Sequence, residues 1–369
     1  MKYNNFLNNR LKIALPLWTV FFPIVGIVLL LLPVGTDSNL YAALLGIILM
    51  TIVVSAVHHA EVVAHKVGEP FGTIILALAI TVLEVSLIVS IMLTEGEKAS
   101  ALARDTVFAA IMLILTGIIG LCLLVGGYRF KEQQFVKQGV SASLVALTAI
   151  VILTLVLPNY TTSEPGPVYN TSQLIFVAII SLVLYAGFIA VQTVRHRDYF
   201  LPEKDDEASG EMHAEPPSKL TAITSLIFLL IALAAVVLLS KKLSPNIEAM
   251  VDGIGAPQSL VGIIIAAVIL FPEGLAAIRA ARKNRLQTSL NLALGSALAS
   301  IGLTIPAVAI VAYFTGFTVT LGIDTKSILL VMLSLFTISI SFGAGRTNIL
   351  QGIVLLVILA TYLFTTIIP

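Results

Sequence analysis

The chain has 369 residues, 58% of them hydrophobic and only 11% charged, with a formal net charge of +1 and a mean hydropathy of +1.04. Because a soluble domain carries about 25% charged residues, a soluble fold of this length could not cover its surface. We therefore expect an integral membrane protein. The net charge of +1 gives no indication of nucleic-acid binding, because the basic residues lie in short loops instead of forming one patch. The single cysteine, Cys122, excludes an intrachain disulfide and a cysteine-based zinc site.

Eleven stretches are long and apolar enough to be membrane-spanning helices, which need about 20 mostly apolar residues each. They lie near residues 14–34, 39–59, 70–93, 105–127, 140–158, 172–194, 220–240, 257–279, 288–315, 326–344 and 348–368. The first stretch lacks a small-x-small cleavage site, so we interpret it as an uncleaved span. The uncharged run over 287–320 leaves room for a broken helix. We predict an all-α polytopic membrane protein.

The loop charges indicate an orientation, because short cytoplasmic loops are enriched in Lys and Arg. With the N-terminus in the cytoplasm, only five of the 21 basic residues fall outside. These five are Lys98, Arg104, Lys241, Lys242 and Lys326. We therefore predict a cytoplasmic N-terminus and an external C-terminus.

One long hydrophilic segment, 195–219, divides the chain and holds seven acidic residues against four basic ones. Its composition indicates a flexible cytoplasmic linker, with loose cation capture or regulation of transport as the alternative. We expect residues 1–36 to form an N-terminal segment with the first span, 37–194 a first five-helix repeat, and 220–369 a second. An odd number of spans per repeat makes the second repeat enter the membrane in the opposite direction, as in inverted-repeat transporters.

A carboxylate, Glu84, stands near the middle of the third predicted span. An ionised side chain at the bilayer centre costs roughly 2.5 kcal/mol or more, so such a residue normally faces an ion path or a partner. Thr81 lies three residues earlier, so on a helix its hydroxyl shares a face with this carboxylate. A buried carboxylate holds a proton or a cation on the same oxygens, which is the competition that an antiporter needs. The alternative is a structural pair with a polar residue of a neighbouring helix.

The eighth predicted span repeats this arrangement with Glu273 near its middle. Pro272 removes a backbone donor and Gly274 loosens the next turn, so we expect the helix to be kinked or unwound there. Freed carbonyls are good oxygen ligands for Ca²⁺ or Na⁺. The alternative is a proline kink with a glutamate that caps a neighbouring helix. We interpret Glu84 and Glu273 as the metal and proton site, in which Glu273 binds more of the cation and Glu84 carries protons.

The span after Glu273 is rich in small and polar side chains. Asn291, Gly295 and Ser296 fit a helix that packs closely and offers an amide oxygen to an ion, but ordinary membrane helix interfaces carry the same residue types. When the two halves are aligned, Phe108 occupies the place of Asn291. The two halves are therefore not chemically equivalent.

Three polar residues, His58, His59 and Glu61, lie close to the predicted cytoplasmic end of the second span. Histidines in such a place could sense pH or bind a metal, which makes these residues candidates for regulation. Histidines solvated at the membrane interface are the alternative.

Five segments carry a family resemblance: GEPFGTIILALAITVLEVSLI, GGYRFKEQQF, FPEGLAAI, QTSLNLALGSALASIGLTIP and GRTNILQG. They resemble segments of the calcium/cation antiporter superfamily, and within it those of the bacterial ChaA-type calcium(sodium, potassium)/proton antiporters. The resemblance implies eleven spans with inverted repeats, alternating access, and export of a cytoplasmic cation in exchange for incoming protons. It also implies that Glu84 and Glu273 match the family's paired acidic ligands, and that Asn291 and Ser296 match its polar ligands on the following helix.

Two departures from the family pattern concern the choice of cation. Many plant and fungal relatives carry an Asn shortly before the first glutamate, in a GNATE-like motif, where this chain reads AITVLE. Asn is also common at the place of Phe108. Poorer ligation in the first half leaves Ca²⁺, Na⁺ and K⁺ open as the main substrate.

The leading hypothesis is a secondary antiporter of the bacterial cell (inner) membrane that exports Ca²⁺, or Na⁺ or K⁺, in exchange for H⁺. The alternatives are a monovalent Na⁺(K⁺)/H⁺ antiporter with little Ca²⁺ activity, a cation channel, and a membrane-embedded enzyme. The chain has no HExxH or GxSxG motif and no histidine in the centre of a predicted span, so we expect no enzyme. We expect no cofactor besides the transported ions and no nucleic-acid partner, and a homo-oligomer stays open.

Overall fold

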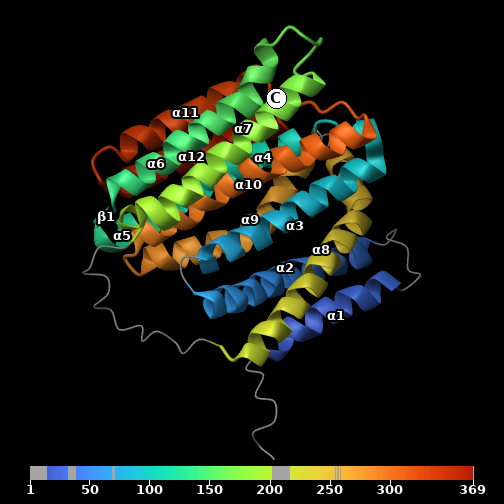
Figure 1. The fold of residues 1–369 in the computed structure, drawn as a ribbon, viewed down its shortest axis with the longest axis horizontal. Helices are drawn as coiled ribbons and strands as arrows, with labels where there is room; N and C mark the ends of the chain where they lie inside the picture. The colour runs from blue at the N-terminus through green and yellow to red at the C-terminus, as the bar shows by residue number, and fades with distance from the viewer. Residues whose placement is uncertain are drawn as a thin grey trace, which may run out of the picture. The chain divides into compact units, whose positions relative to one another are not determined.

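The computed structural model describes residues 15–31, 39–68, 71–201, 217–253, 255, 257 and 259–368, which are almost entirely helical (Figure 1). The α-helices are α1 (Leu17–Leu31), α2 (Asn39–Val67), α3 (Phe71–Glu95), α4 (Leu102–Met112), α5 (Ile119–Phe130), α6 (Lys137–Val151), α7 (Thr171–Ala190), α8 (Lys219–Gly253), α9 (Ser259–Arg282), α10 (Leu286–Thr315), α11 (Thr325–Ser341) and α12 (Ile349–Ile367). Three π-helical segments are η2 (Leu113–Ile118), η3 (Ile152–Val156) and η5 (Val191–Arg195), and three short 3₁₀ segments are η1 (Gly96–Ala99), η4 (Leu157–Tyr160) and η6 (Arg197–Tyr199).

The number of spans agrees with the prediction. Segment η2 joins α4 to α5 without a break, so the described part of the chain contains eleven continuous helical stretches, and each overlaps one predicted span. Nine of these stretches are long and apolar enough to cross a membrane. The other two, α1 and α11, have 15 and 17 residues and therefore reach about 22–26 Å at 1.5 Å per residue. The all-α fold is confirmed.

Two expected helix breaks are absent. Helix α9 is α-helical over all its 24 residues and α10 over all its 30. Helix α9 is therefore not unwound beside Glu273 and α10 is not broken, while a kink at Pro272 stays a prediction. Pro272 still withholds a hydrogen bond from the carbonyl of Val268. A transmembrane helix tolerates this loss when neighbouring helices surround it, and α9 packs on α4, α5 and α10.

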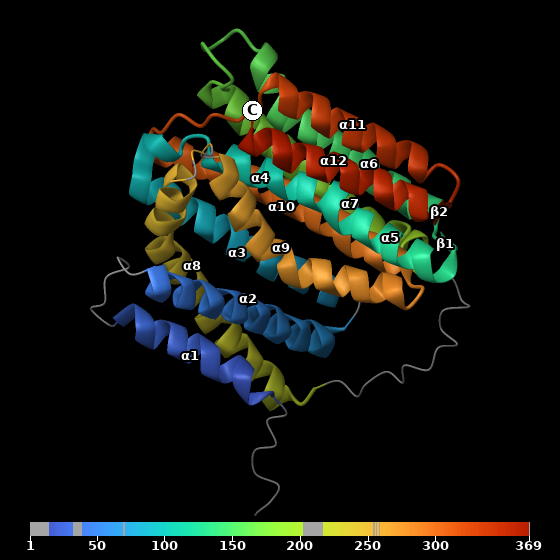
Figure 2. The same cartoon turned by 180° about the vertical axis from the view of Figure 1, so that it is seen from behind.

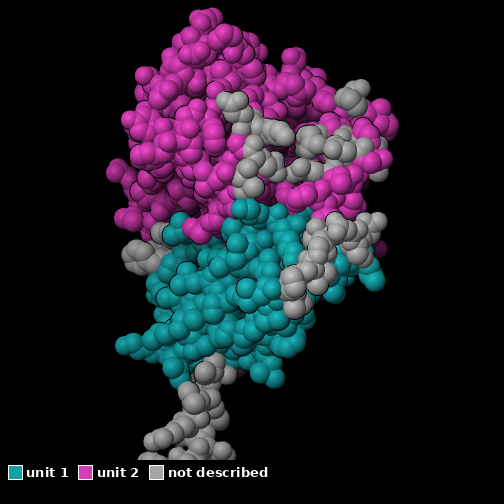
Figure 3. All heavy atoms as spheres, turned by 90° about the vertical axis from the view of Figure 1, so that its right-hand side faces the viewer, with its two compact units in different colours: residues 1–80, 212–243 teal, residues 81–211, 244–369 magenta. Residues whose placement is uncertain are grey.

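The chain forms two compact units, which Figure 3 colours separately: residues 1–80 with 212–243 (unit 1) and residues 81–211 with 244–369 (unit 2). In unit 1, α1 packs on α2 around the carbonyl of Thr19. Pro23, four residues later, has no N–H to donate to this carbonyl. Ser55 Oγ donates to it at 2.6 Å, and His59 Nε2 lies 3.1 Å from it. Helix α2 therefore supplies the hydrogen bonds that the proline removes from α1.

Unit 2 contains both predicted carboxylates, and its helices pack against partners that are distant in sequence. Helix α5 lies against α12, α10 against α7, and α9 against α4 and α10 (Figures 1 and 2). Strands β1 (Glu132–Gln134) and β2 (Arg346–Asn348) form an antiparallel pair with Gln133 opposite Thr347. Val168 and Thr320 form an isolated antiparallel bridge.

These two pairings are reciprocal with respect to the predicted repeats. Strand β1 follows the third span of the first repeat, and β2 precedes the last span of the second repeat. Thr320 follows the third span of the second repeat, and Val168 precedes the last span of the first. Two repeats related by a two-fold axis would produce this pattern. The repeat boundaries stay a prediction, and residues 202–216 of the acidic linker lie outside the described residues.

Candidate functional site

The two predicted carboxylates meet the same helix, α10. Ser300 Oγ donates a 2.6 Å hydrogen bond to Glu84 Oε1, and Ser296 Oγ donates to Glu273 Oε2. The two serines are four residues apart, so they share a face of α10 and lie about 6 Å apart along its axis. Helix α10 thus bonds to the carboxylates of α3 and α9 through two serines that lie one turn apart. The structure brings Glu84, Glu273 and Ser296 together, as neighbours on three helices.

Neither carboxylate has a cationic partner among the ion pairs of the described residues. Glu84 is 3% exposed and Glu273 is half-buried, and they are close enough for their negative charges to repel each other. Removing ionised groups from water costs several kcal/mol per ion unless an opposite charge compensates for it. A proton or a cation must therefore supply the missing positive charge.

A cation at this site would need neutral oxygens as well as the carboxylates. The described residues contain no group of three or more His, Cys, Asp or Glu side chains that could hold a metal ion. The hydroxyls of Ser296 and Ser300 are the neutral oxygens that touch the carboxylates. Thr81, three residues before Glu84 and 4% exposed, lies on the same face of α3.

Segment η2 packs against α9 next to Glu273. A Cβ on Gly274, the residue after Glu273, would come within 3.3 Å of Ile118 Cδ1. The glycine therefore allows α9 to approach η2 closely beside the carboxylate. Single π-helical turns inside α-helices are frequent at functional sites. The site is thus built by α3, α9 and α10, with η2 supporting α9.

Asn291, a predicted ligand, lies elsewhere. Its Nδ2 donates to the carbonyl of Phe200 at 2.6 Å, and its Oδ1 accepts from Gln287 Nε2 at 2.8 Å. Five residues separate Asn291 from Ser296, which places them about 140° apart around the helix, so the two side chains leave α10 on different faces. The ligand role of Asn291 stays a prediction, and it requires a state in which the bond to Phe200 is open.

Two glutamines, Gln133 and Gln287, connect α9 and α10 to the segment around β1. Gln287 Oε1 accepts from the backbone N–H of Val136, just after β1, at 2.7 Å. In return Gln133 of β1, 2% exposed, donates from Nε2 to the carbonyl of Ala281 in α9 at 3.0 Å. This reciprocal pair fixes the end of α9 and the start of α10 to the first half of the chain.

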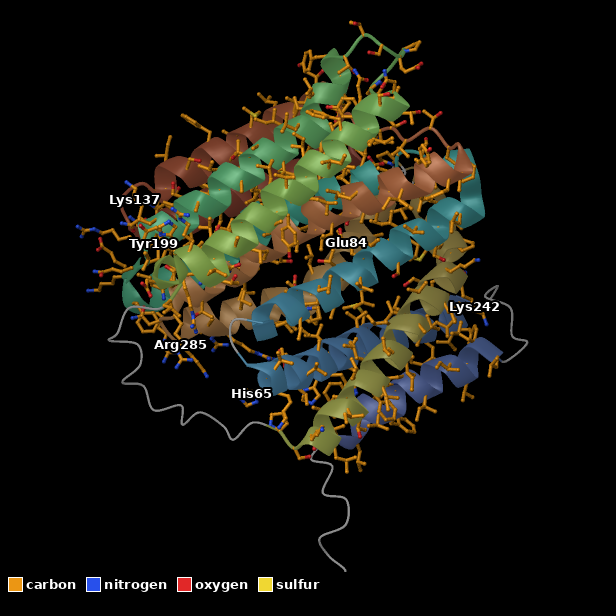
Figure 4. All side chains as sticks on the ribbon, in the orientation of Figure 1. His65, Glu84, Lys137, Tyr199, Lys242 and Arg285 are labelled. Atoms are coloured by element: carbon orange, nitrogen blue, oxygen red, sulfur yellow. The ribbon has the colours of Figure 1, made fainter. Side chains whose placement is uncertain are left out.

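The same end of unit 2 holds the root of the acidic linker. Figure 4 shows Lys137 of α6, Tyr199 of η6 and Arg285, which precedes α10, gathered at this end, with Glu84 away from them on α3. Phe200 is 7% exposed. The first residues of the 195–219 segment are therefore packed into unit 2 up to this position.

The first half offers no counterpart of Asn291 at its aligned position. Phe108 is 5% exposed, and its ring packs edge-on against Tyr362 with 5.5 Å between ring centroids. A buried aromatic ring cannot supply an oxygen ligand. Both glutamates accept hydrogen bonds from hydroxyls of α10, which belongs to the second half.

Sequence reasoning did not select Ser300 as a site residue. The signal was present, because Ser300 follows Ser296 by four residues and so occupies the same helical face. What the sequence lacked was the pairing of α10 with α3, which decides that Ser300 meets Glu84.

The three candidate regulatory residues lie on α2 in unit 1. The carbonyl of Thr19 can only accept, so His59 Nε2 carries the hydrogen in the contact between them. His59 is fully buried, and its ring stacks on Phe228 with 5.7 Å between centroids. It therefore helps to hold α1, α2 and α8 together, while Glu61 is exposed. A regulatory role of His58, His59 and Glu61 stays a prediction.

Comparison with known protein families decides the relationship. The family model described as sodium/calcium exchanger protein matches residues 38–194 and 224–368, which include both glutamates and α10. The chain belongs to this family. The resemblance to the calcium/cation antiporter superfamily is thereby confirmed.

Two curated relatives of this sodium/calcium exchanger family member match nearly its whole length. One, from Sinorhizobium fredii (strain NBRC 101917 / NGR234), is named as an ionic transporter, y4hA, and is 41% identical over 370 residues, which cover 98% of this chain and 100% of the relative. The other is the sodium-potassium/proton antiporter ChaA of Escherichia coli (strain K12), 37% identical over 355 residues, which cover 94% of this chain and 95% of the relative.

Solved structures show the same fold. The structure of native YfkE superposes with a TM-score of 0.71 at 18% identity, covering 96% of this chain and 99% of that one. The H⁺/Ca²⁺ exchanger CAX gives a TM-score of 0.73 at 15% identity, covering 94% and 87%. The family fold therefore extends over nearly the whole chain.

Proposed function

We propose that this protein is a secondary cation/proton antiporter of the bacterial cell (inner) membrane that exports Ca²⁺ in exchange for H⁺. The proposal is carried by one observation: two carboxylates from different helices are hydrogen-bonded to two serines one turn apart on α10, without a basic partner among the described residues. The names of two relatives support it. The E. coli relative is named a proton antiporter, and a relative from Aphanothece halophytica, 26% identical over 274 residues, is named a Ca²⁺/H⁺ antiporter.

The exchange follows from charge balance. Two ionised carboxylates are neutralised by one Ca²⁺, by two monovalent cations or by two protons. Because protons and cations occupy the same oxygens, binding of one displaces the other. A serine hydroxyl donates to an ionised carboxylate while its lone pairs face a cation, and it accepts from a protonated carboxyl group. Ser296 and Ser300 therefore suit both states of the site.

The two carboxylates differ in access, which supports a division of labour. Glu273 is half-buried, while Glu84 is 3% exposed. A cation that still carries water reaches the more accessible group first, so we assign more of the cation binding to Glu273 and the proton to Glu84. Ca²⁺ takes six to eight oxygen ligands, and the two carboxylates with two hydroxyls reach the lower limit. Thr81 is the next oxygen on the Glu84 face.

A monovalent Na⁺(K⁺)/H⁺ antiporter with little Ca²⁺ activity is the second candidate. The observation that favours it is the small number of neutral oxygens at the carboxylates, because Asn291 bonds to Phe200 and Phe108 packs on Tyr362. The name of the E. coli relative, a sodium-potassium/proton antiporter, agrees with this candidate.

Alternating access completes the proposal. Five-helix repeats over 37–194 and 220–369 would rock around the carboxylates, with 1–36 as an added N-terminal segment and 195–219 as the cytoplasmic linker. The reciprocal contacts of β1 with β2 and of Val168 with Thr320 support such a repeat. The N-terminus lies in the cytoplasm and the C-terminus outside. The ions are cargo, so the proposal requires neither an enzymatic step nor a cofactor.

Everted membrane vesicles test the proposed function. With a pH gradient established by respiration, addition of Ca²⁺, Na⁺ or K⁺ should collapse the gradient, and the order of the three ions decides between the two candidates. Glu84→Gln and Glu273→Gln should abolish the collapse at unchanged protein levels, because each removes one of the two charges. Glu164→Gln is the control, since it removes an exposed carboxylate outside the site. Full exchange in both site variants would refute the assignment.

A further inference from the structure

A third hydroxyl continues the line of Ser296 and Ser300 along α10. Thr304 lies four residues after Ser300 on the same face, is 0% exposed, and its Oγ1 has no hydrogen-bond partner among the described residues. Other buried hydroxyls in the helices of unit 2 donate to the carbonyl four residues earlier. They are Thr116, Ser143, Thr154, Ser181 and Ser334. Thr304 departs from this pattern although its position would permit it.

A second buried hydroxyl without a partner belongs to Thr106 of α4. Thr106 is 0% exposed, and its Oγ1 also lacks a hydrogen-bond partner in the described part of the chain. The backbone of α4 passes directly over Gly262 of α9, where a Cβ would come within 3.0 Å of Thr106 N. Helices α4, α9 and α10 also pack on one another, and the two threonines are buried residues of two of these helices.

The order of these groups along the interface follows from the pairing of α9 with α10. Ser289 Oγ donates to the carbonyl of Ala277 at 2.7 Å, and Ser296 donates to Glu273. The residue number falls in α9 as it rises in α10, so the two helices are antiparallel. Positions on either helix can therefore be placed on one common axis.

Measured on this axis from the level of Glu273, the groups follow one another at short intervals. With a rise of 1.5 Å per residue, Ser300 lies about 6 Å along, Thr304 about 12 Å, and Gly262 about 16 Å. Gly262 marks the level of Thr106, whose backbone touches it. Thr304, the first unpaired hydroxyl, therefore lies one turn of α10 beyond Ser300, which bonds to Glu84.

Asp105, the residue before Thr106 on α4, is an acidic residue with a partly exposed side chain. Asp105 forms a 2.7 Å ion pair with Arg104, and its side chain is 16% exposed. Arg104 Nη1 also donates to the carbonyl of Gly322 at 3.2 Å, and Asp324 is close enough to act electrostatically on Asp105. The interface therefore leads from the buried Glu84 site to a partly exposed carboxylate.

We propose that Thr304 and Thr106 form a further binding station for the transported cation, between the Glu84–Glu273 site and Asp105. The inference rests on the proposed antiport and adds a route and two residues to it. An unpaired buried hydroxyl lowers the stability of the fold. Fold stability therefore gives no reason for the presence of two such hydroxyls at adjacent levels of the helices. Hydroxyl oxygens can replace water in the coordination shell of a hard cation, and this use accounts for both.

The test compares Thr304→Val and Thr106→Val with Thr304→Ser, which keeps the hydroxyl. Thr154→Val is the matched control, because Thr154 is also 0% exposed but donates to Ile150. The apparent KM for Ca²⁺ and Na⁺ is measured from each membrane face in everted and right-side-out vesicles. We expect both valine variants to raise KM about fivefold, the effect of losing one polar contact, from the face of Asp105 only. Thr304→Ser and Thr154→Val should match the wild type.

The melting temperature of the purified variants separates transport from folding. Replacing an unpaired hydroxyl by a methyl group should leave the melting temperature of Thr304→Val unchanged or raise it. An unchanged KM from both faces, with wild-type exchange intact, overturns the station and leaves the antiport standing. An equal rise from both faces, or a lowered melting temperature, assigns a structural role and also overturns it. Absence of exchange in the wild type overturns the proposed function itself.

Discussion

Replacing Ser300 by alanine should weaken cation binding by a predictable amount. Ser300 is 2% exposed and donates a 2.6 Å hydrogen bond to Glu84 Oε1. A hydrogen bond to an ionised group contributes about 1.5–3 kcal/mol, and one between neutral groups about 0.5–1.5 kcal/mol. The cation-bound site keeps Glu84 ionised, whereas the proton-bound site makes it neutral. Ser300→Ala therefore disfavours the cation-bound state relative to the proton-bound state by about 1 kcal/mol.

This difference corresponds to roughly a fivefold rise in the apparent KM for the cation at fixed pH. The assay is cation-induced collapse of the pH gradient in everted vesicles, titrated with Ca²⁺ and Na⁺ at equal protein levels. Ser289→Ala is the control on the same helix, because Ser289 is 1% exposed and donates to the backbone carbonyl of Ala277 instead of a carboxylate. Its KM should stay within twofold of the wild type.

Two results would contradict the reasoning. If Ser300→Ala leaves KM unchanged, the bond to Glu84 contributes equally in both states and Ser300 does not tune the exchange. If Ser289→Ala raises KM as much as Ser300→Ala does, the effect comes from the packing of α10 and not from the carboxylate.

Two further substitutions test the surroundings of the site. Asn291→Ala should lower the free energy of unfolding by about 1 kcal/mol through its lost hydrogen bonds, measured by thermal melting. Vesicle titration of the same variant tests the predicted ligand role: a tenfold rise in the cation KM would support it, and a KM within twofold of the wild type would refute it. Gly262→Ala should lower the free energy of unfolding by about 1–3 kcal/mol by overpacking, because its Cβ would meet the α4 backbone at 3.0 Å. Gly295→Ala has open space around its Cβ and should melt like the wild type; equal melting of both variants would disprove the tight contact.

The membrane fold could be predicted because the bilayer imposes a local rule. A spanning helix needs about 20 apolar residues whatever its neighbours are, so the eleven stretches were visible as eleven runs of sequence. A second local signal was misleading in the interior of α9 and α10. Proline and small polar residues predicted a break, but packing by α4, α5, α7 and α10 keeps both helices continuous.

The site shows the same division between local and nonlocal information. Glu84 and Glu273 stood out because a charge within an apolar span is costly, and Ser296 because it lies in a polar helix. Asn291 was chosen by residue type; its spacing of five residues from Ser296 places it on another face of α10, and its ligand role stays a prediction. Ser300 was passed over, although its spacing of four placed it on the same face as Ser296.

The sequence by itself determined which segments span the membrane, which spans carry a carboxylate, and which side chains share a helical face. Each of these depends only on hydrophobicity or on the 3.6-residue period of one helix. The tertiary structure decided that α10 lies against both carboxylates, that Ser300 bonds to Glu84, and that Gln133 and Gln287 hold α9 and α10 to β1. These contacts depend on the relative register of helices far apart in the chain, which is set by side-chain packing and is absent from the pattern of any single span.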